Sequence, residues 1–175
     1  MKVETYSQYL RKKLHDEMDR LKVEATKFSD DKIVQIGCSI LEPSGARIST
    51  GFNVLPIALS CDSSFSSIWT KKDVDIGSGI TLNKREIVTH AEISALNNLR
   101  FKSLHHYDIS ECICVVTAYP CVACAIQLLS AGIRHIVYDY NPKLNNHEAK
   151  AYKAKWIFEH FKDADKLNIV PIQDI

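Results

Sequence analysis

Two short segments of the sequence carry residues that could bind a metal ion, T-H-A-E at 89–92 and T-A-Y-P-C-V-A-C at 117–124. In the second segment, Pro120 is expected to open a helix, in the first-turn position that proline tolerates best. Cys121 and Cys124 are three residues apart at that helix start, so their sulfurs share one face. Free backbone N–H groups at a helix start favour thiolates, and two thiolates at this spacing suit zinc.

A C-x-x-C pair alone is ambiguous, because it also occurs in redox pairs, in structural zinc sites and as two core cysteines. His90 changes the interpretation, although a single histidine at a helix start is more often a capped or packed residue. Together with Cys121 and Cys124 it makes a three-ligand group with one open coordination position. That arrangement is typical of a catalytic zinc, which lowers the pKa of a bound water towards neutrality.

Glu92 lies two residues beyond His90, in the same predicted helical turn. This short separation disfavours Glu92 as a fourth ligand but places its carboxylate near the open coordination position. There it could take a proton from water and pass it to a ring nitrogen and then to a departing amine. Alone, Glu92 would be interpreted as a first-turn acid that complements the helix dipole. Its combination with the three ligands favours a catalytic role.

The rest of the chain divides into elements that must position these residues. Residues 5–28 have the spacing of an amphipathic helix, and strands at 32–41 and 46–53 flank a turn at 43–45, as in a hairpin. The second half alternates helix and strand, which favours a parallel sheet with helices on its faces. Its predicted helices are 90–100, 121–132 and 145–162, and its strands are 112–117, 134–138 and 167–172. The predicted fold class is therefore α/β, a three-layer α/β/α sandwich with a mixed five-stranded sheet.

Length and composition bound the remaining possibilities. The 175 residues suit one domain, 1–175, with a buried core, and 22 basic against 21 acidic residues give a net charge of +1. That balance argues against nucleic acid as a partner. The sequence has no long apolar stretch for a membrane, and its charged N-terminus lacks the apolar core of a secretory signal. Six unevenly spaced cysteines then indicate reduced thiols and a cytoplasmic location.

The H-x-E and P-C-x-x-C segments together resemble the signature of zinc-dependent deaminases. The chain resembles the cytidine and deoxycytidylate deaminase superfamily over residues 33–172. The resemblance includes T-G-F-N at 50–53, A-G-I at 131–133 and V-Y at 137–138. It implies a cytidine deaminase-like fold and a role in pyrimidine nucleotide metabolism. The reaction would be hydrolysis of the amino group at C4 of cytosine, which yields uracil and ammonia.

Residue roles follow from this resemblance. His90, Cys121 and Cys124 would bind zinc, and Glu92 would move protons. Asn53 would bind the sugar, the backbone around Ala91 and Pro120 would read the base edge, and Tyr140 would border the pocket. Some relatives bind a second, structural zinc, but the long connection here offers Cys61 without a histidine or a second cysteine, so we expect one Zn²⁺ per chain. Val54 and Ser94 depart from the family pattern of Gly and Asn at those places.

The connection at 54–87 is long for a small domain, which indicates a functional or interface segment. It contains Trp69 and ends in Asn83-Lys84-Arg85, so a loop entering the pocket could place Arg85 near a 5′-phosphate. The expected substrate is therefore dCMP or a 5-substituted dCMP. Activation by a nucleoside triphosphate stays open, and relatives lead us to expect a homo-oligomer.

Two alternatives remain at this stage. The first is a deaminase of the same fold that acts on another base, namely guanine, cytidine or adenosine in tRNA. The second is a structural zinc module or a catalytically dead relative, against which the presence of Glu92 argues.

Overall fold

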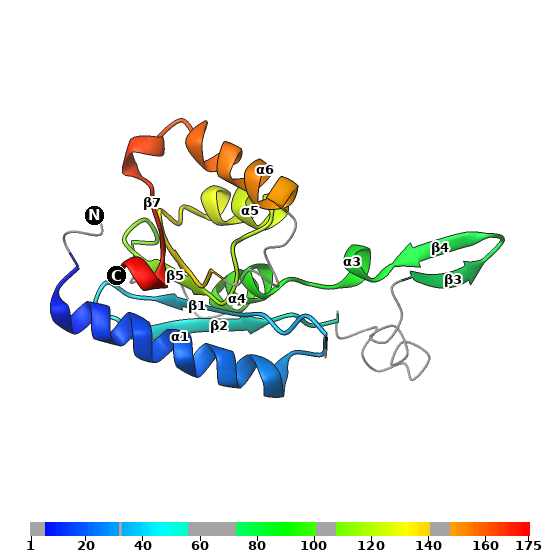
Figure 1. The fold of residues 1–175 in the computed structure, drawn as a ribbon, viewed down its shortest axis with the longest axis horizontal. Coiled ribbons are helices and arrows are strands. Elements are labelled where there is room, and N and C mark those ends of the chain that lie inside the picture. Colours follow the sequence, from blue (N-terminus) through cyan, green and yellow to red (C-terminus); the bar gives the residue numbers. More distant parts are fainter. Residues whose placement is uncertain (1–5, 32, 56–72, 101–107, 141–147) are drawn as a thin grey trace.

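A five-stranded sheet forms the centre of the computed structural model, and helices cover both of its faces (Figure 1). The structure describes residues 6–31, 33–55, 73–100, 108–140 and 148–175. In chain order, its elements are α1 (Gln8–Phe28), β1 (Gly37–Leu41), β2 (Arg47–Phe52), β3 (Asp73–Gly77), β4 (Ile80–Asn83), α3 (Lys84–Ile87), α4 (Ala91–Arg100), β5 (Ile113–Val116), α5 (Val122–Ala131), β6 (His135–Tyr138), α6 (Glu148–Glu159), η4 (Ala164–Lys166), β7 (Asn168–Pro171) and η5 (Ile172–Asp174). The predicted α/β/α sandwich with a mixed five-stranded sheet is confirmed.

The strand order of the sheet is β2-β1-β5-β6-β7. β1 is antiparallel to both β2 and β5, whereas β5, β6 and β7 are parallel to one another. The predicted hairpin and the predicted parallel half are therefore both present. β1 begins at Gly37 rather than at residue 32, because the Asp31 carboxylate accepts hydrogen bonds from the backbone N–H groups of Ile33 and Val34 and turns the chain there.

Two hydrophobic clusters hold the layers together, one on each face of the sheet. The first lies between the sheet and α4, α5 and α6, and the second lies between the sheet and α1. Successive residues of β5 alternate between the clusters, as a strand buried on both faces requires. Cys112 and Cys114 are completely buried in the first cluster, where they are small core residues.

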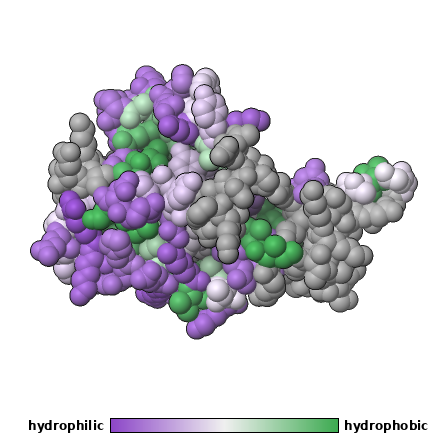
Figure 2. Space-filling view, viewed as in Figure 1, coloured by the Kyte–Doolittle hydropathy of each residue, from purple (hydrophilic) through white to green (hydrophobic). Residues whose placement is uncertain are grey.

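Helix α1 is amphipathic, as its spacing predicts. Its buried residues are Leu10, Leu14, Glu17, Met18, Leu21 and Ala25, and the surface over the helix is mainly hydrophilic in Figure 2. Val23 is near the same helical spacing, which predicts that it lies on the buried face, but it is 54% exposed, so that prediction is wrong. The helix starts at Gln8 rather than at residue 5, because the Ser7 hydroxyl accepts a hydrogen bond from the Leu10 N–H and caps the first turn.

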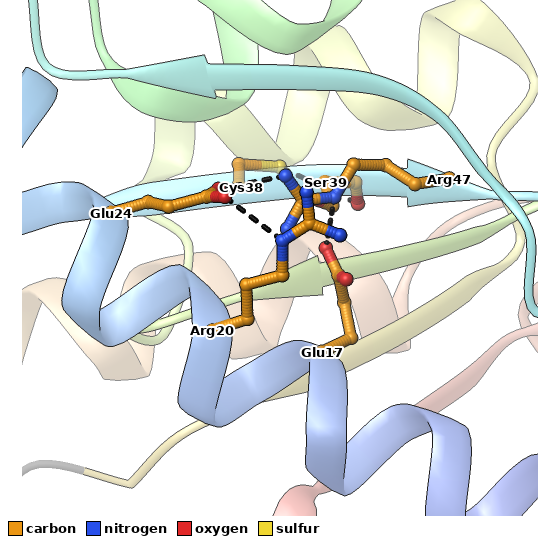
Figure 3. Close-up of polar contacts among 6 residues, drawn as sticks. All are labelled: Glu17, Arg20, Glu24, Cys38, Ser39 and Arg47. Carbon is orange, nitrogen blue, oxygen red and sulfur yellow. Dashed lines mark hydrogen bonds and ion pairs between the residues drawn. The ribbon is translucent and has the colours of Figure 1, made fainter.

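A half-buried ion-pair network joins α1 to β2 (Figure 3). Arg47 donates from Nε to Glu17 Oε1 at 2.7 Å and from Nη1 to Glu24 Oε2 at 2.7 Å. Arg20 donates to the other oxygen of Glu24 at 2.9 Å. Burial would raise the pKa of Glu24, but the bonds from Arg47 and Arg20 outweigh it and lower that pKa. The network fixes how α1 lies across the sheet.

On the opposite face, α4 lies directly against the backbone of β2 at Gly51. A Cβ atom added to Gly51 would overlap the backbone N of Ala95 and the backbone O of Ala91, and it would lie 2.7 Å from the carbonyl carbon of Ser94. The Ser49 hydroxyl also donates to the Ala95 carbonyl at 2.6 Å. Only glycine at position 51 allows this approach, so Gly51 sets the height of α4 above the sheet.

The connection at 54–87 contains more regular structure than the sequence predicts. Val54 forms an isolated bridge with Thr89, and β3 and β4 form a separate hairpin that projects from the body in Figure 1. Ser78 and Gly79 form its two-residue turn with φ values of 57° and 72°. Cys61 and Trp69 lie outside the described residues. Among the described helices, none is long and apolar enough to cross a membrane.

Replacing Gly51 by Ala is expected to destabilise the fold. The added methyl group must push α4 away from β2, and overpacking of this kind costs about 1–3 kcal/mol in the free energy of unfolding. Urea titration measures this quantity. Gly79→Asn is the control, because nothing lies within 4 Å of a Cβ there and Asn tolerates its positive φ. Equal stability of Gly51→Ala and the wild type would contradict the close approach.

Candidate active site

His90, Cys121 and Cys124 come together in the structure as the sequence predicts. The His90 Nδ1 atom lies 3.5 Å from Cys121 Sγ and 3.4 Å from Cys124 Sγ. All three possible ligand atoms lie within 4.8 Å of one another. Among the described residues, this is the one group of His, Cys, Asp or Glu side chains that could hold a metal ion. Residues from two segments some 30 positions apart therefore share a single site.

Two helix starts create this convergence. His90 directly precedes α4, Cys121 is the N-cap residue of α5, and Cys124 lies in the first turn of α5. Pro120 is buried one residue before the N-cap, so the expectation that it opens the helix at its first position is wrong. α5 begins one residue later because Cys121 is extended, with φ −75° and ψ 170°. Both helices direct their free N–H groups towards the site.

Cys121 and Cys124 shift the pKa values of each other's thiols in opposite directions. A hydrogen bond from Cys124 lowers the pKa of Cys121 to about 4, against the effect of burial, and His90 adds to the lowering. The same hydrogen bond, with burial, raises the pKa of Cys124. Cys121 is therefore a thiolate and Cys124 the thiol that donates to it. A metal that binds both sulfurs would release the proton of Cys124.

The geometry of the group fits one zinc ion per chain. Tetrahedral zinc with ordinary bonds of about 2.3 Å to sulfur and 2.0–2.1 Å to nitrogen holds those two atoms about 3.6 Å apart. The observed nitrogen–sulfur separations of 3.5 and 3.4 Å agree with that value. One imidazole and two sulfurs also form a donor set that zinc prefers over magnesium or calcium.

Glu92 is buried beside this group, in the first turn of α4. Burial raises its pKa, while its own backbone N–H and the nearby His90 oppose the increase. Its carboxylate also interacts with the Cys124 thiol. A carboxyl group that is only 5% exposed and lacks any ion pair among the described residues is costly as a structural element. Its position suits proton exchange with a molecule at the metal.

Asn53 and Ala91 lie in direct contact. The Asn53 Oδ1 atom accepts a hydrogen bond from the Ala91 N–H at 3.0 Å, and Nδ2 donates to the Val34 carbonyl at 2.8 Å. Asn53 is 6% exposed. The structure thus brings Asn53 to the helix start that carries His90 and Glu92, and both ends of its side-chain amide bond to backbone.

Tyr140 and Arg85 are the remaining residues expected at the substrate. Tyr140 is 56% exposed at the rim of a cavity of about 770 Å³ below α6. Tyr119, Tyr138 and Phe158 also line this cavity, but none of the metal-binding residues does. Arg85 belongs to α3, and its side chain lies outside what the structure describes.

Sequence reasoning missed two features of the site. It quoted T-G-F-N at 50–53 without a reason for Gly51, whose missing side chain admits α4. It also passed over Ser29-Asp30-Asp31, which bonds to the segment around Asn53. A cluster of Ser and Asp directly after an amphipathic helix is a turn signal that could have found the second feature.

Comparison with known proteins places these observations in a family. Residues 11–140 match the family model of the cytidine and deoxycytidylate deaminase zinc-binding region. A probable deoxycytidylate deaminase from Caenorhabditis elegans is 31% identical over 133 residues, which are 75% of this chain and 58% of that protein. The chain spans less than two thirds of the length of the curated relatives it matches.

Solved structures share the fold at low sequence identity. The dCMP deaminase from cyanophage S-TIM5, in complex with dCMP and dUMP, is 17% identical with a TM-score of 0.56, covering 90% of this chain and 94% of that one. A variant of NE0047 in complex with 8-azaguanine is 16% identical with a TM-score of 0.53, covering 94% of this chain and 78% of the other. Because the family model spans most of the chain and includes the His90 and Cys121/Cys124 segments, this protein belongs to the cytidine and deoxycytidylate deaminase family.

Proposed function

We propose that the protein is a zinc-dependent aminohydrolase that converts dCMP, or a 5-substituted dCMP, into the corresponding uracil nucleotide and ammonia. The observation that carries this proposal is the burial of Glu92 beside the convergent group of His90, Cys121 and Cys124. A metal module used only for structure has no need of a buried carboxyl group at that place. The curated relatives named deoxycytidylate deaminase support the choice of substrate.

The proposed chemistry assigns each residue one task. His90, Cys121 and Cys124 hold the metal, which when bound acidifies water at the open position. Glu92 would accept one proton from the attacking water and donate it to the ring nitrogen next to C4. It would then take the second proton, from the hydroxyl group now on C4, and donate it to the amine, which leaves as ammonia while the C4 carbonyl forms. Burial raises the pKa of Glu92, which brings its two protonation states closer in energy at neutral pH and suits repeated transfer.

Substrate contacts belong to the same proposal. Asn53 is proposed to face the sugar, with the backbone at Ala91 and Pro120 against the base edge. Tyr140 would border the pocket, and Arg85 would meet the 5′-phosphate. We further propose a cytosolic location, because the paired thiols at 121 and 124 require a reducing compartment. We also propose that the protein is a homo-oligomer, as the resemblance to its relatives leads us to expect. Regulation by a nucleoside triphosphate is part of the same hypothesis.

A deaminase of another base is the second candidate. The fold itself does not select the base, since a structure in complex with 8-azaguanine shares it. The net charge of +1 argues against a tRNA substrate, because sequence-independent binding to nucleic acid depends on a basic surface.

Purified protein is expected to contain close to one zinc ion per chain, measured by elemental analysis. Cys124→Ser should lose most of that zinc, because a hydroxyl is a poor zinc ligand beside a thiolate. Cys112→Ser is the matched control, since Cys112 is equally buried but lies outside the group. Full zinc occupancy of Cys124→Ser would contradict the assignment.

Glu92→Gln is expected to keep zinc and fold but to lower kcat by about 10²–10⁴-fold, because an amide of the same size cannot carry the proton. Glu111→Gln, at an exposed position before β5, should retain wild-type activity. Ammonia release and circular dichroism separate loss of chemistry from loss of fold. Activity that survives in Glu92→Gln would refute the mechanism.

The substrate is tested by measuring kcat/KM for ammonia release from dCMP, CMP, dCTP, deoxycytidine, guanine and tRNA. A site that reads the phosphate predicts a strong preference for dCMP over deoxycytidine. Arg85→Ala or Lys84→Ala should weaken that preference by about tenfold, as expected for loss of a charged hydrogen bond. Equal kcat/KM values for dCMP and deoxycytidine would show that the phosphate is not read. Fast release from guanine or tRNA would replace the substrate class and leave the metal chemistry in place.

A further inference from the structure

The segment that follows α1 is bonded to the end of β2 at Asn53. The Asn53 carbonyl accepts hydrogen bonds from the Ser29 hydroxyl at 3.1 Å and from the Asp30 N–H at 2.9 Å. The Ser29 hydroxyl also lies 3.2 Å from the Asp31 carbonyl, so it contacts both the turn after α1 and the end of β2. Ser29 is completely buried and Asp31 is 2% exposed. These polar groups are therefore part of the interior rather than of a solvated turn.

Asp31 fixes the second half of this segment. Its Oδ1 atom accepts hydrogen bonds from the N–H groups of Ile33 at 2.9 Å and Val34 at 3.1 Å. This turn presents the Val34 carbonyl to the Asn53 side chain, whose Nδ2 donates to it at 2.8 Å. Asn53 is thereby held through its backbone by Ser29 and through its side chain by the turn that Asp31 makes.

The other end of the Asn53 amide caps α4. Its Oδ1 atom accepts a hydrogen bond from the N–H of Ala91, the first residue of the helix. Free N–H groups at a helix start need an acceptor, and the residue before the helix usually supplies one. Here that residue is His90, whose Nδ1 faces the two sulfurs. The acceptor for Ala91 comes from β2 instead, which leaves His90 available to the metal.

We propose that Ser29 and Asp31 are positioning residues for the active site, acting through Asn53 on the first turn of α4. By fixing Asn53, they set where His90 and Glu92 stand relative to Cys121 and Cys124. The bridge between Val54 and Thr89, with hydrogen bonds of 3.0 and 2.9 Å, supports the same connection. The kinetic part of this inference rests on the proposed function, whereas its effect on metal retention does not.

This positioning role is separable from a contact between Asn53 and the sugar. Loss of a sugar contact would raise KM, and it would change only substrates that carry the sugar. Ser29 and Asp31 are buried behind Asn53, and neither touches solvent enough to meet a substrate. Neither residue can lose a substrate contact of its own, so a fall in kcat without a rise in KM reports on positioning.

The experiment compares Asp31→Ala with Asp31→Asn, because Asn keeps the Oδ1 acceptor and Ala does not. Three quantities are measured on the zinc-loaded protein: kcat for dCMP, the rate of zinc loss to a chelator, and amide hydrogen exchange at residues 91–94. KM for dCMP is measured with kcat. Asp31→Ala should lower kcat and speed zinc loss by about tenfold each, with faster exchange, as is usual when support behind a metal ligand is removed. KM should stay within about twofold. Asp31→Asn should restore all three quantities.

Equal defects in Asp31→Ala and Asp31→Asn, or a change in thermal stability with all three quantities unaltered, would overturn the inference. Ser29→Ala provides the same comparison with a smaller change if Asp31→Ala does not fold. Should the wild type deaminate none of the tested compounds, the proposed function fails while zinc loss and hydrogen exchange still decide the positioning role. Should the wild type be active and Asp31→Ala match it throughout, the positioning role alone fails.

Discussion

The close approach of α4 to β2 at Gly51 is the constraint on which the arrangement of the site depends. A helix normally stands off a sheet by the thickness of the side chains between them, but here the backbone of Ala91 to Ala95 fills the place of a Cβ atom. The bond from Ser49 to the Ala95 carbonyl holds the helix at this height. Since His90 and Glu92 lie at the start of α4, the height of the helix determines whether they can meet residues of α5.

Electrostatics at the two helix starts then determine the chemistry. The starts of α4 and α5 lie at the same site, and the hydrogen bond from Cys124 lowers the pKa of Cys121 there. Two thiolates and an imidazole make a site for a cation, and a bound cation offsets the cost of burying a second thiolate at Cys124. The pKa of Glu92 is subject to two opposing effects, because burial disfavours the charged carboxylate while the nearby His90 favours it.

The far face of the sheet contributes by fixing the chain that leads to the site. Arg47, Glu17 and Glu24 hold α1 against β2 (Figure 3). The segment after α1 then returns across the end of β2 at Asn53. The contacts run from α1 to Asn53 and on to the first turn of α4. The metal group therefore receives support from both faces of the sheet, although its ligands come from one face only.

The sequence by itself determined the fold class, the alternation of strands and helices, and the identity of the metal group, because these depend on local periodicity and on residue types with few other uses. His90, Cys121 and Cys124 were assigned from their residue types, from their spacing and from the resemblance to zinc-dependent deaminases, and they lie together in the structure. What spacing could not determine were contacts between distant segments: the trans cap of α4 by Asn53, the turn at Asp31 that delays β1 to Gly37, and the overlap at Gly51. The sequence pattern also put Pro120 in the first turn of α5, which begins later because Cys121 is extended. It put Val23 on the buried face of α1, whereas packing of that helix against the sheet leaves Val23 exposed. A hydrogen bond between residues 53 and 91 leaves no periodic trace in either segment, so only the folded chain reveals it.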